Sequence, residues 1–510
     1  MVMKKLNSIL FHRSVTVGVS LFIQVLLMAA MILRFSEYTA YFYFGCVLIS
    51  FLSMLWILSR RMEPGYKIAW MIPILLMPVF GGIFYLLVGG NGVTRGARKK
   101  LQGVERRTRE TLAGDFNSDQ MIKEGEDAAG QARYMERYAC CPVYRNTQTE
   151  YFPLGELAFE RMLEELERAE RYIFLEYFII QEGTLWNRML DVLRRKAAQG
   201  VEVRVIYDDF GCMYTLPENY GAKLEAMGIQ CRVFGRLIPV VSIRQNNRDH
   251  RKMLIIDGKT AFTGGMNLAD EYINKIVRFG HWKDSAILLR GAAVWSMTVM
   301  FLGMWNHLAG WEEDFESFRP MSLPQREGEG WVQPYTDSPL DHEKVGQTVY
   351  LNMISRARKS IYITTPYLIV DESTCTALCN AAKMGVDVRI IVPHVPDKKY
   401  VFEVTKAHYP PLLESGVKIY EYTPGFIHAK NFMVDGRYAT VGTVNLDYRS
   451  LFLHFENGVW LYDAPCIRDV EADFLETVKV CEEITLRKTR KISLPGYLYR
   501  SILRVFAPLM

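Results

Sequence analysis

The stretch DHRKMLIIDGKTAFTGGMN at residues 249–267 recurs in altered form as IHAKNFMVDGRYATVGTVN at residues 427–445. In both copies a His is followed two positions later by Lys and seven positions later by Asp-Gly, and a pair of small residues and an Asn follow at matching spacings. An Asp-Gly pair between two apolar runs is typical of a tight β-hairpin turn. Each copy is therefore predicted to form a strand, a turn and a returning strand.

The spacing within each copy assigns its side chains to the two faces of the strand. His250 and Lys252 are two positions apart, so both project from the same face, which we expect to line a cleft. Asp257 falls on the opposite face beside the turn, where we expect its carboxylate to accept backbone N–H bonds and so to have an architectural part in the catalytic motif. The second copy repeats this arrangement with His428, Lys430 and Asp435.

The paired motifs indicate chemistry on a phosphoryl group. Asn267 and Asn445 follow the small residues of each copy, so the cleft is predicted to contain two imidazoles, two ammonium groups and two amides. Fixed cations and amide donors stabilise an anionic phosphoryl centre, and paired His side chains suit a nucleophile opposed by a general acid and base. A metal is disfavoured because each His has a Lys beside it that repels a cation, and no cofactor is expected.

The repetition extends beyond the two motifs. KAAQGVEVRVIY at residues 196–207 matches AAKMGVDVRIIV at residues 381–392, and both have the pattern of a helix end, a Gly stop and a strand. Strands that alternate with helical stretches indicate βαβ units. The soluble part is therefore predicted to be two fused, similar α/β domains, at residues 131–322 and 323–486, that share one cleft.

The amino-terminal part of the chain is apolar. The uncharged runs at residues 15–33 and 41–58 are long enough to be predicted as membrane-spanning helices, and a cleaved signal peptide fits the first run poorly because further apolar segments follow it. We expect a helical membrane region at residues 1–92 and a basic linker at residues 93–130.

A third apolar run at residues 68–90 is interrupted by Pro73, Pro78, Gly81 and Gly82. A re-entrant or interfacial segment is preferred to a full span, because every basic cluster then stays on the cytoplasmic side with the catalytic domains. The tail at residues 487–510 is basic and amphipathic, and it either lies along the membrane surface or docks as an ordinary core helix.

The overall composition adds three weaker constraints. The net charge of +5 is small for 510 residues, which does not favour nucleic acid as a partner. The nine Cys residues show no metal-ligand spacing and are typical of reduced thiols that face a cytosolic compartment. Nothing in the sequence determines the oligomeric state.

The pattern H-x-K-x4-D-x6-G-G/S-x-N in both copies resembles that of the phospholipase D superfamily, with Thr443 in the small-residue place of the second copy. The resemblance implies a duplicated α/β sandwich in which one His attacks phosphorus and forms a phosphohistidine. The other His protonates the leaving alcohol and then deprotonates the acceptor. It also implies that acidic residues downstream of each motif, Asp284 and Glu456, orient the imidazoles, and it favours His250 as the nucleophile.

The run SRRMEPGYKIAWMIPILLMPVFGGIFYLLVGGN at residues 59–91, together with GGMNLADEY and NLDYRS, resembles the bacterial cardiolipin synthases within that superfamily. The resemblance implies a multi-pass protein of the bacterial cell membrane that transfers a phosphatidyl group between two phosphatidylglycerol molecules, among anionic lipids. A membrane-bound phospholipase D that uses water as the acceptor, a membrane-tethered nuclease and a non-catalytic scaffold are the alternatives, in falling order.

Overall fold

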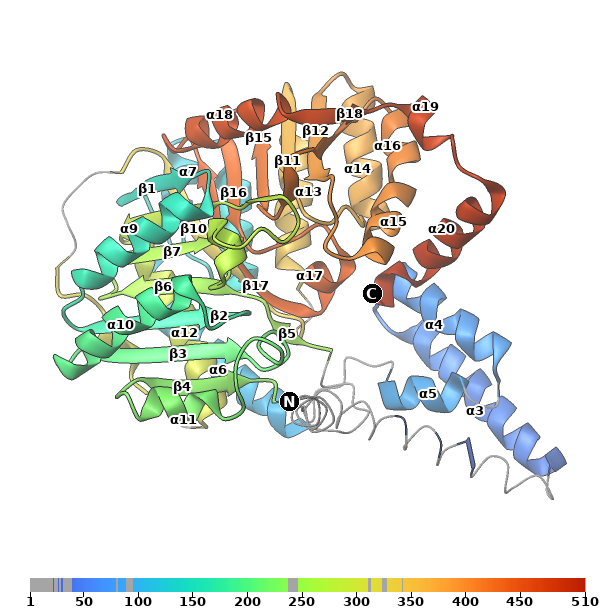
Figure 1. Cartoon of the computed structure of the whole chain (residues 1–510), viewed down its shortest axis with the longest axis horizontal. Helices are drawn as coiled ribbons and strands as arrows, with labels where there is room; N and C mark the ends of the chain where they lie inside the picture. The colour runs from blue at the N-terminus through green and yellow to red at the C-terminus, as the bar shows by residue number, and fades with distance from the viewer. Residues whose placement is uncertain are drawn as a thin grey trace, which may run out of the picture.

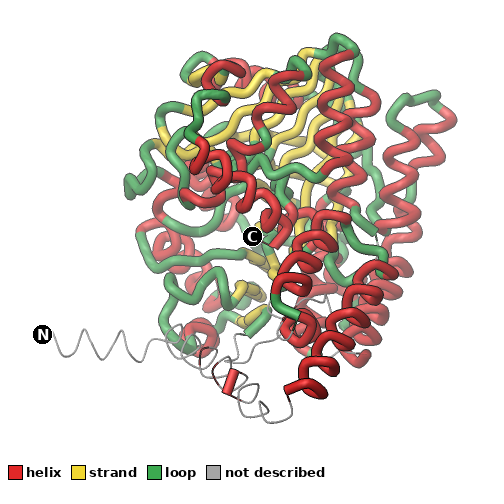
Figure 2. Tube along the Cα trace, turned by 90° about the vertical axis from the view of Figure 1, so that its right-hand side faces the viewer, coloured by secondary structure: helices red, strands yellow, loops and turns green. Residues whose placement is uncertain are grey.

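The computed structural model describes residues 39–78, 81–88, 95–236, 246–310, 313–322, 328–341 and 343–509, together with the isolated positions 22, 26, 29 and 30. Two β-sheets lie side by side with helices on their outer faces, and the amino-terminal helices project on one side of this body (Figure 1). Figure 2, turned by 90° from Figure 1, shows the carboxyl terminus in front of the two sheets and close to the projecting amino-terminal helices.

The first half of the catalytic body is a seven-stranded sheet in the order β1-β9-β7-β6-β2-β3-β4. Its strands are β1 (Thr147–Phe152), β2 (Tyr172–Tyr177), β3 (Glu202–Asp208), β4 (Gln230–Phe234), β6 (Lys252–Ile256), β7 (Thr260–Gly264) and β9 (Ala286–Gly291). The helices of this half are α9 (Gly155–Glu167), α10 (Thr184–Ala198), α11 (Tyr220–Glu225), η4 (Asp270–Ile273), α12 (Val294–Ala309) and η5 (Phe315–Phe318). Strands β2, β3 and β4 are parallel, and the others are antiparallel.

The second half repeats this order as β10-β17-β16-β15-β11-β12-β13 and adds β18 at the edge. Its strands are β10 (Trp331–Asp337), β11 (Ser360–Thr364), β12 (Asp387–Pro393), β13 (Lys418–Tyr422), β15 (Asn431–Val434), β16 (Tyr438–Gly442), β17 (His454–Tyr462) and β18 (Cys481–Ile484). Its helices are α13 (Val345–Arg356), α14 (Glu372–Lys383), α15 (Lys399–Ala407), α16 (Tyr409–Glu414), α17 (Tyr448–Phe452), α18 (Ile467–Val478), α19 (Leu486–Thr489) and α20 (Leu494–Phe506). The predicted duplication of an α/β unit is confirmed.

The two halves exchange short strands. β5 (Arg248–Asp249), immediately before the first motif, pairs in parallel with β17 of the second half. In the same way β14 (Gly425–Ile427), immediately before the second motif, pairs in parallel with β8 (His281–Lys283) of the first half. The largest apolar core runs across both halves and includes Ile255 of the first sheet and Val441 of the second. Each motif is therefore held by the backbone of the opposite half.

The Asp residues of the motifs are architectural, but they act at a different place from the one expected. Asp257 is in the left-handed region at φ 55°, and its carboxylate accepts the backbone N–H groups of Glu170, Arg171 and Tyr172 at 2.9, 2.7 and 2.9 Å. Asp435, also at φ 55°, accepts the N–H groups of Arg358, Lys359 and Ser360 at 2.8, 2.7 and 2.8 Å. Each carboxylate thus ties the hairpin turn to the start of the neighbouring strand, β2 or β11.

The amino-terminal helices are α3 (Thr39–Ser59), α4 (Pro64–Leu76), α5 (Gly81–Val88), α6 (Arg95–Leu112), η2 (Ala113–Asp115), α7 (Ser118–Lys123) and α8 (Ala129–Ala139). The run at residues 15–33 lies almost wholly outside the described residues. Among those that are described, no helix combines the length and the apolar character that a bilayer crossing requires, so the predicted spans are not confirmed. The third run is broken as expected, because α4 ends at Leu76 and α5 begins at Gly81.

Asp435→Ala is expected to destabilise the second half by about 1–3 kcal/mol, because the main-chain N–H groups of Arg358, Lys359 and Ser360, which are exposed or half-buried, lose a charged acceptor. Asp463→Ala is the matched control. Asp463 also has a positive φ, of 49°, but its carboxylate binds the half-exposed Arg437 side chain at 2.6 Å. The control therefore isolates the backbone strain, which costs about 1–2 kcal/mol. Denaturant unfolding compares the two variants, and equal losses would contradict the architectural role.

Candidate active site

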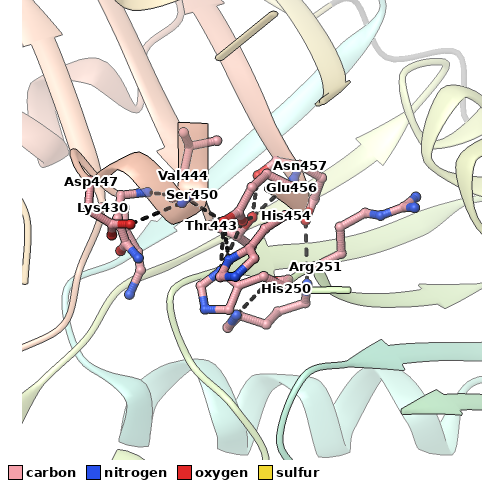
Figure 3. Close-up of polar contacts among 12 residues, drawn as sticks. His250, Arg251, Lys430, Thr443, Val444, Asp447, Ser450, His454, Glu456 and Asn457 are labelled. Carbon is pink, nitrogen blue, oxygen red and sulfur yellow. Dashed lines mark hydrogen bonds and ion pairs between the residues drawn. The ribbon is translucent and has the colours of Figure 1, made fainter. Parts of the chain in front are cut away.

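His250 lies where β5 passes into β6, and its side chain is buried. Its Nδ1 atom is 2.9 Å from Oε1 and 3.0 Å from Oε2 of Glu456, a fully buried residue of β17 (Figure 3). The main-chain N–H of His250 donates to the carbonyl of Phe455 at 2.9 Å, which fixes the backbone of the imidazole next to that of its carboxylate. An Nδ1–H held by a carboxylate leaves the Nε2 lone pair available for chemistry.

His428 has the same environment with the halves reversed. Its Nδ1 atom is 2.7 Å from Oδ2 of the buried Asp284, and its main-chain N–H donates to the carbonyl of Lys283 at 2.7 Å. The sequence order associates each carboxylate with the His upstream of it in the same half. The structure corrects this expectation, because each carboxylate binds the His of the opposite half, through the exchanged strands β5 and β14.

Charged groups of both halves act on the two imidazoles. Burial lowers the pKa of His250 well below its ordinary value, and the charges of Lys252, Lys430 and His428 lower it further. Burial and the Lys430 ammonium lower the pKa of His428 to about 4, and Asp284 opposes this shift. Groups from both halves thus act on each ring, and these shifts favour the neutral form of both imidazoles near pH 7.

The motif lysines are buried cations close to their own His residues. Lys252 Nζ donates to the carbonyl of His250 at 2.6 Å. Lys430 Nζ donates to the carbonyl of His428 and lies 3.0 Å from His428 Nε2. Burial is the main reason that the pKa of Lys252 falls to about 8 and that of Lys430 to about 7. The Glu456 and Asp284 carboxylates oppose these shifts only in part, and an anion bound beside the two ammonium groups would favour their charged forms.

The two motif Asn residues differ, although the sequence predicted the same phosphate contact for both. Asn267 accepts the N–H of Ile179 at 3.0 Å and donates to the Tyr272 hydroxyl at 2.7 Å, so its amide fixes the local loop. Asn445 has its main-chain N–H bonded to the Ser450 hydroxyl at 2.8 Å. Its buried Oδ1 has no hydrogen-bond partner within the described part of the chain. Asn445 therefore retains an amide atom for a ligand, and Asn267 is a positioning residue.

Sequence reasoning missed the hydroxyl groups that hold Glu456. Thr443 Oγ1 donates to Oε2, and Ser450 Oγ donates to Oε1 at 2.5 Å (Figure 3). Asp284 has a different support, since its Oδ1 accepts the backbone N–H of Ser285 at 2.8 Å. The sequence did contain a signal for this contact, because Thr443 stands where the first copy has a glycine. A threonine hydroxyl at that position can donate a hydrogen bond, which glycine cannot.

A third imidazole, that of His454, also escaped the sequence analysis. Its ring centroid is 5.4 Å from that of His250, and its Nδ1 is 3.7 Å from Glu456 Oε1, too far for a hydrogen bond. Among the described residues neither ring nitrogen has a hydrogen-bond partner. His454 is two positions before Glu456 on β17 and so shares its face, which is the signal that was overlooked.

Two groups of described residues have the proximity that a metal ion needs: His250, His454 and Glu456, and His394, Glu421 and Glu482. In the first group the carboxylate already binds Nδ1 of the imidazole, and the Lys252 cation is adjacent. In the second, Glu421 binds His394 at 2.9 Å and Glu482 binds Lys488. Neither group is assigned to a metal, and independence from metal and cofactor stays a prediction.

Comparison with known proteins agrees with this geometry. The family model described as cardiolipin synthase, PLD-like domain, matches residues 162–277 and 350–478, and the phospholipase D-nuclease N-terminal model matches residues 48–90. An uncharacterised protein of Streptococcus mutans is 43% identical over 90% of this chain and 99% of its own length. A cardiolipin synthase of Geobacillus sp. strain WCH70 is 34% identical over 88% of this chain and 89% of its own, and cardiolipin synthase 2 of Bacillus anthracis is 34% identical over 92% and 90%.

Among solved structures, a phosphatidylserine synthase of Haemophilus influenzae superposes with a TM-score of 0.56 at 16% identity, over 74% of this chain and 97% of its own. This likeness concerns the fold alone. Each half carries an HxK motif, each carboxylate binds the His of the opposite half, and curated cardiolipin synthases are similar to nearly the whole chain. The chain therefore belongs to the cardiolipin synthase family of the phospholipase D superfamily.

Proposed function

We propose that this protein is a cardiolipin synthase that transfers a phosphatidyl group from one phosphatidylglycerol to a hydroxyl group of a second, giving cardiolipin and free glycerol. The observation that carries the proposal is the single buried site in which two His–carboxylate pairs, built across the halves, share two ammonium groups. The cardiolipin synthase relatives support a lipid phosphodiester as the substrate.

In the first step the Nε2 atom of His250 attacks phosphorus while the bond from phosphorus to the glycerol oxygen breaks. His428, in its protonated form, donates a proton to that oxygen, and glycerol leaves. The anionic phosphodiester raises the pKa of His428 from its low value in the empty site, since a nearby negative charge favours the imidazolium. Lys252 and Lys430 stabilise the charge that develops on the phosphoryl oxygens.

In the second step the neutral His428 takes a proton from a hydroxyl group of the second phosphatidylglycerol. The resulting oxygen attacks phosphorus, the N–P bond to His250 breaks, and cardiolipin leaves. The proton given up in the first step is thus recovered in the second, and the enzyme returns to its starting state. The acceptor must outcompete water, which a lipid-facing, desolvated cleft favours.

The environments of the two rings support His250 as the nucleophile. Burial and four neighbouring groups, Lys252, Lys430, His428 and Lys398, all lower the pKa of His250, which favours an unprotonated Nε2. For His428, the charge and hydrogen bond of Asp284 act in the opposite direction and favour its protonated form. A neutral ring suits attack, and a more easily protonated ring suits acid catalysis.

We also propose that this enzyme acts at the cytoplasmic face of the bacterial cell membrane, among anionic lipids and without nucleic acid as a partner. In this proposal the chain consists of a membrane region at 1–92, a linker at 93–130, catalytic domains at 131–322 and 323–486, and a tail at 487–510. The strands of the first sheet all lie within 131–322, and those of the second, β5 aside, lie within 323–486, which supports the division.

Purified full-length protein with labelled phosphatidylglycerol is expected to yield cardiolipin and glycerol in equal amounts, because one glycerol leaves for each phosphatidyl group transferred. Thin-layer chromatography and a glycerol assay measure both products. Phosphatidic acid as the main lipid product would show that water is the acceptor and would replace the proposal by a phospholipase D. The His428→Ala variant is the blank.

The value of kcat/KM is expected to fall as the pH rises from about 7 to about 8. In the free enzyme the pKa of Lys430 is about 7 and that of Lys252 about 8, and each ammonium is lost above its pKa. Rates at low substrate between pH 5.5 and 9 measure this decline. Lys430→Arg, whose guanidinium stays charged, is expected to move the decline to higher pH. A profile that is flat to pH 9 would contradict the role of the ammonium groups.

Rapid quenching under non-acidic conditions with phosphorus-labelled phosphatidylglycerol is expected to leave label on His250, because the intermediate is a phosphohistidine at the attacking ring. Peptide mapping locates the label. The His250→Ala variant is the control and is expected to retain none. Label on the peptide that contains His428 would reverse the two roles.

A further inference from the structure

Helix α20 near the carboxyl end packs on the second half through one face only. Arg500 Nε is 2.7 Å from Oε2 of Glu403 on α15, and Leu503 packs against a small buried cluster that contains Ile369 and Val404. These contacts fix the rotation of α20 about its own axis. The side chains that point away from α15 are therefore held outward.

The outward face of α20 is apolar. Leu494, Leu498 and Ile502 follow one another at intervals of four residues, and their side chains are 72%, 53% and 58% exposed. Tyr497 and Tyr499 flank this stripe and are 59% and 50% exposed. Helix positions four apart lie on one face, so Leu494, Leu498 and Ile502 form an apolar strip, and the two tyrosines lie along its opposite edges. We refer to these five residues as the α20 strip.

The helix is joined to the amino-terminal helices at its end. It continues into η6 (Ala507–Leu509), whose Ala507 and Pro508 are buried. Leu509 packs against the cluster of Ile57, Trp70, Ile74 and Tyr85 from α3, α4 and α5. Figure 1 shows the carboxyl end of α20 near α4. That end of the helix therefore lies close to helices that themselves expose large apolar side chains, among them Ile68, Leu75 and Leu76.

Basic residues surround the α20 strip. Arg487 and Lys491 are exposed just before the helix, and Arg504 is exposed near its end. An apolar strip with flanking tyrosines and cations is the composition of helices that lie in the interface of an anionic bilayer. Such a surface attracts the basic side chains and accommodates the aromatic rings at the level of the headgroups.

We propose that α20 docks on an anionic lipid bilayer, with Leu494, Leu498 and Ile502 among the outer parts of the acyl chains. The exposed basic side chains that flank the strip favour an anionic bilayer over a second copy of the chain, which carries a net charge of +5, as the occupant. The docking itself does not rest on the proposed function; only its expected effect on the turnover of vesicle lipid does.

The test places a polarity-sensitive fluorophore on the α20 strip of the full-length protein. Leu498→Cys is labelled, and Met384→Cys, 76% exposed after α14, is the matched control. The unsubstituted protein gives the background, because seven of the nine native thiols are buried. The protein is reconstituted in vesicles of phosphatidylcholine and phosphatidylglycerol, with and without a nitroxide-labelled lipid.

We expect the emission at position 498 to be blue-shifted and to be quenched by the nitroxide lipid. We expect neither effect at position 384. Emission at position 498 that matches position 384 would overturn the proposal. Emission that is blue-shifted but insensitive to the nitroxide lipid, with energy transfer between labelled copies, would also overturn it and would assign the strip to an interface between chains.

A second measurement does not depend on labelling. Leu498→Ser combined with Ile502→Ser is expected to raise the apparent KM for vesicle lipid about tenfold, because apolar area is lost from the bilayer contact. The rate with detergent-dispersed lipid is expected to stay unchanged. The control variant Met384→Ser is expected to leave the rate unchanged with both vesicle lipid and detergent-dispersed lipid. Equal loss in vesicles and detergent would overturn the docking role. The fluorescence measurement does not require enzymatic activity. A failure of the proposed function can therefore be distinguished from a failure of the docking.

Discussion

The active site depends on one constraint, the hydrogen bond from each catalytic imidazole to a carboxylate of the opposite half. His250 binds Glu456 at 2.9 Å, and His428 binds Asp284 at 2.7 Å. The exchanged strands β5 and β14 make these bonds possible, because they bring the backbone of each His beside the residue that precedes its carboxylate. Neither half contains a complete His–carboxylate pair, so the duplicated units form one functional site only together.

The crossed pairs are surrounded by buried positive charge. Lys252 and Lys430 lie beside the rings, and burial lowers the pKa of each ammonium toward neutrality. In the proposed reaction an anionic phosphodiester beside them favours the charged ammonium groups and raises the pKa of the His that acts as the acid. The same charges that bind the substrate therefore adjust the protonation of the catalytic rings, which is why an independent metal ion has no place in the proposed steps.

The two halves have diverged at the positions that support the carboxylates. A Cβ atom at Gly265 of the first half would come 2.1 Å from Asp284 Oδ1, so no side chain fits there. The equivalent position in the second half is Thr443, whose hydroxyl donates to Glu456. His454 adds a further imidazole on the side of Glu456 only. A symmetric fold has thereby acquired two chemically different rings, as a reaction with separate nucleophile and acid requires.

Much of the local geometry of the two motifs could be predicted from their spacing. The repeated motif predicted the hairpins, the shared face of His250 and Lys252, and the architectural role of Asp257, because the strand period of two is a local property of the backbone. It also predicted a duplicated α/β fold, which the matching strand orders confirm. These features depend on residues a few positions apart, and pattern reasoning is effective at that range.

Tertiary structure decided what the spacing did not contain. The crossing of Asp284 and Glu456, the commitment of Asn267 to its own loop and the presence of His454 in the site all involve atoms brought together by the packing of two sheets. The α20 strip likewise became visible only when the contacts of Arg500 and Leu503 fixed which side of the helix faces outward. Sequence determines which side chains share a face. Which partner that face meets is decided by long-range packing, because residues far apart in the chain contact one another only in the folded state.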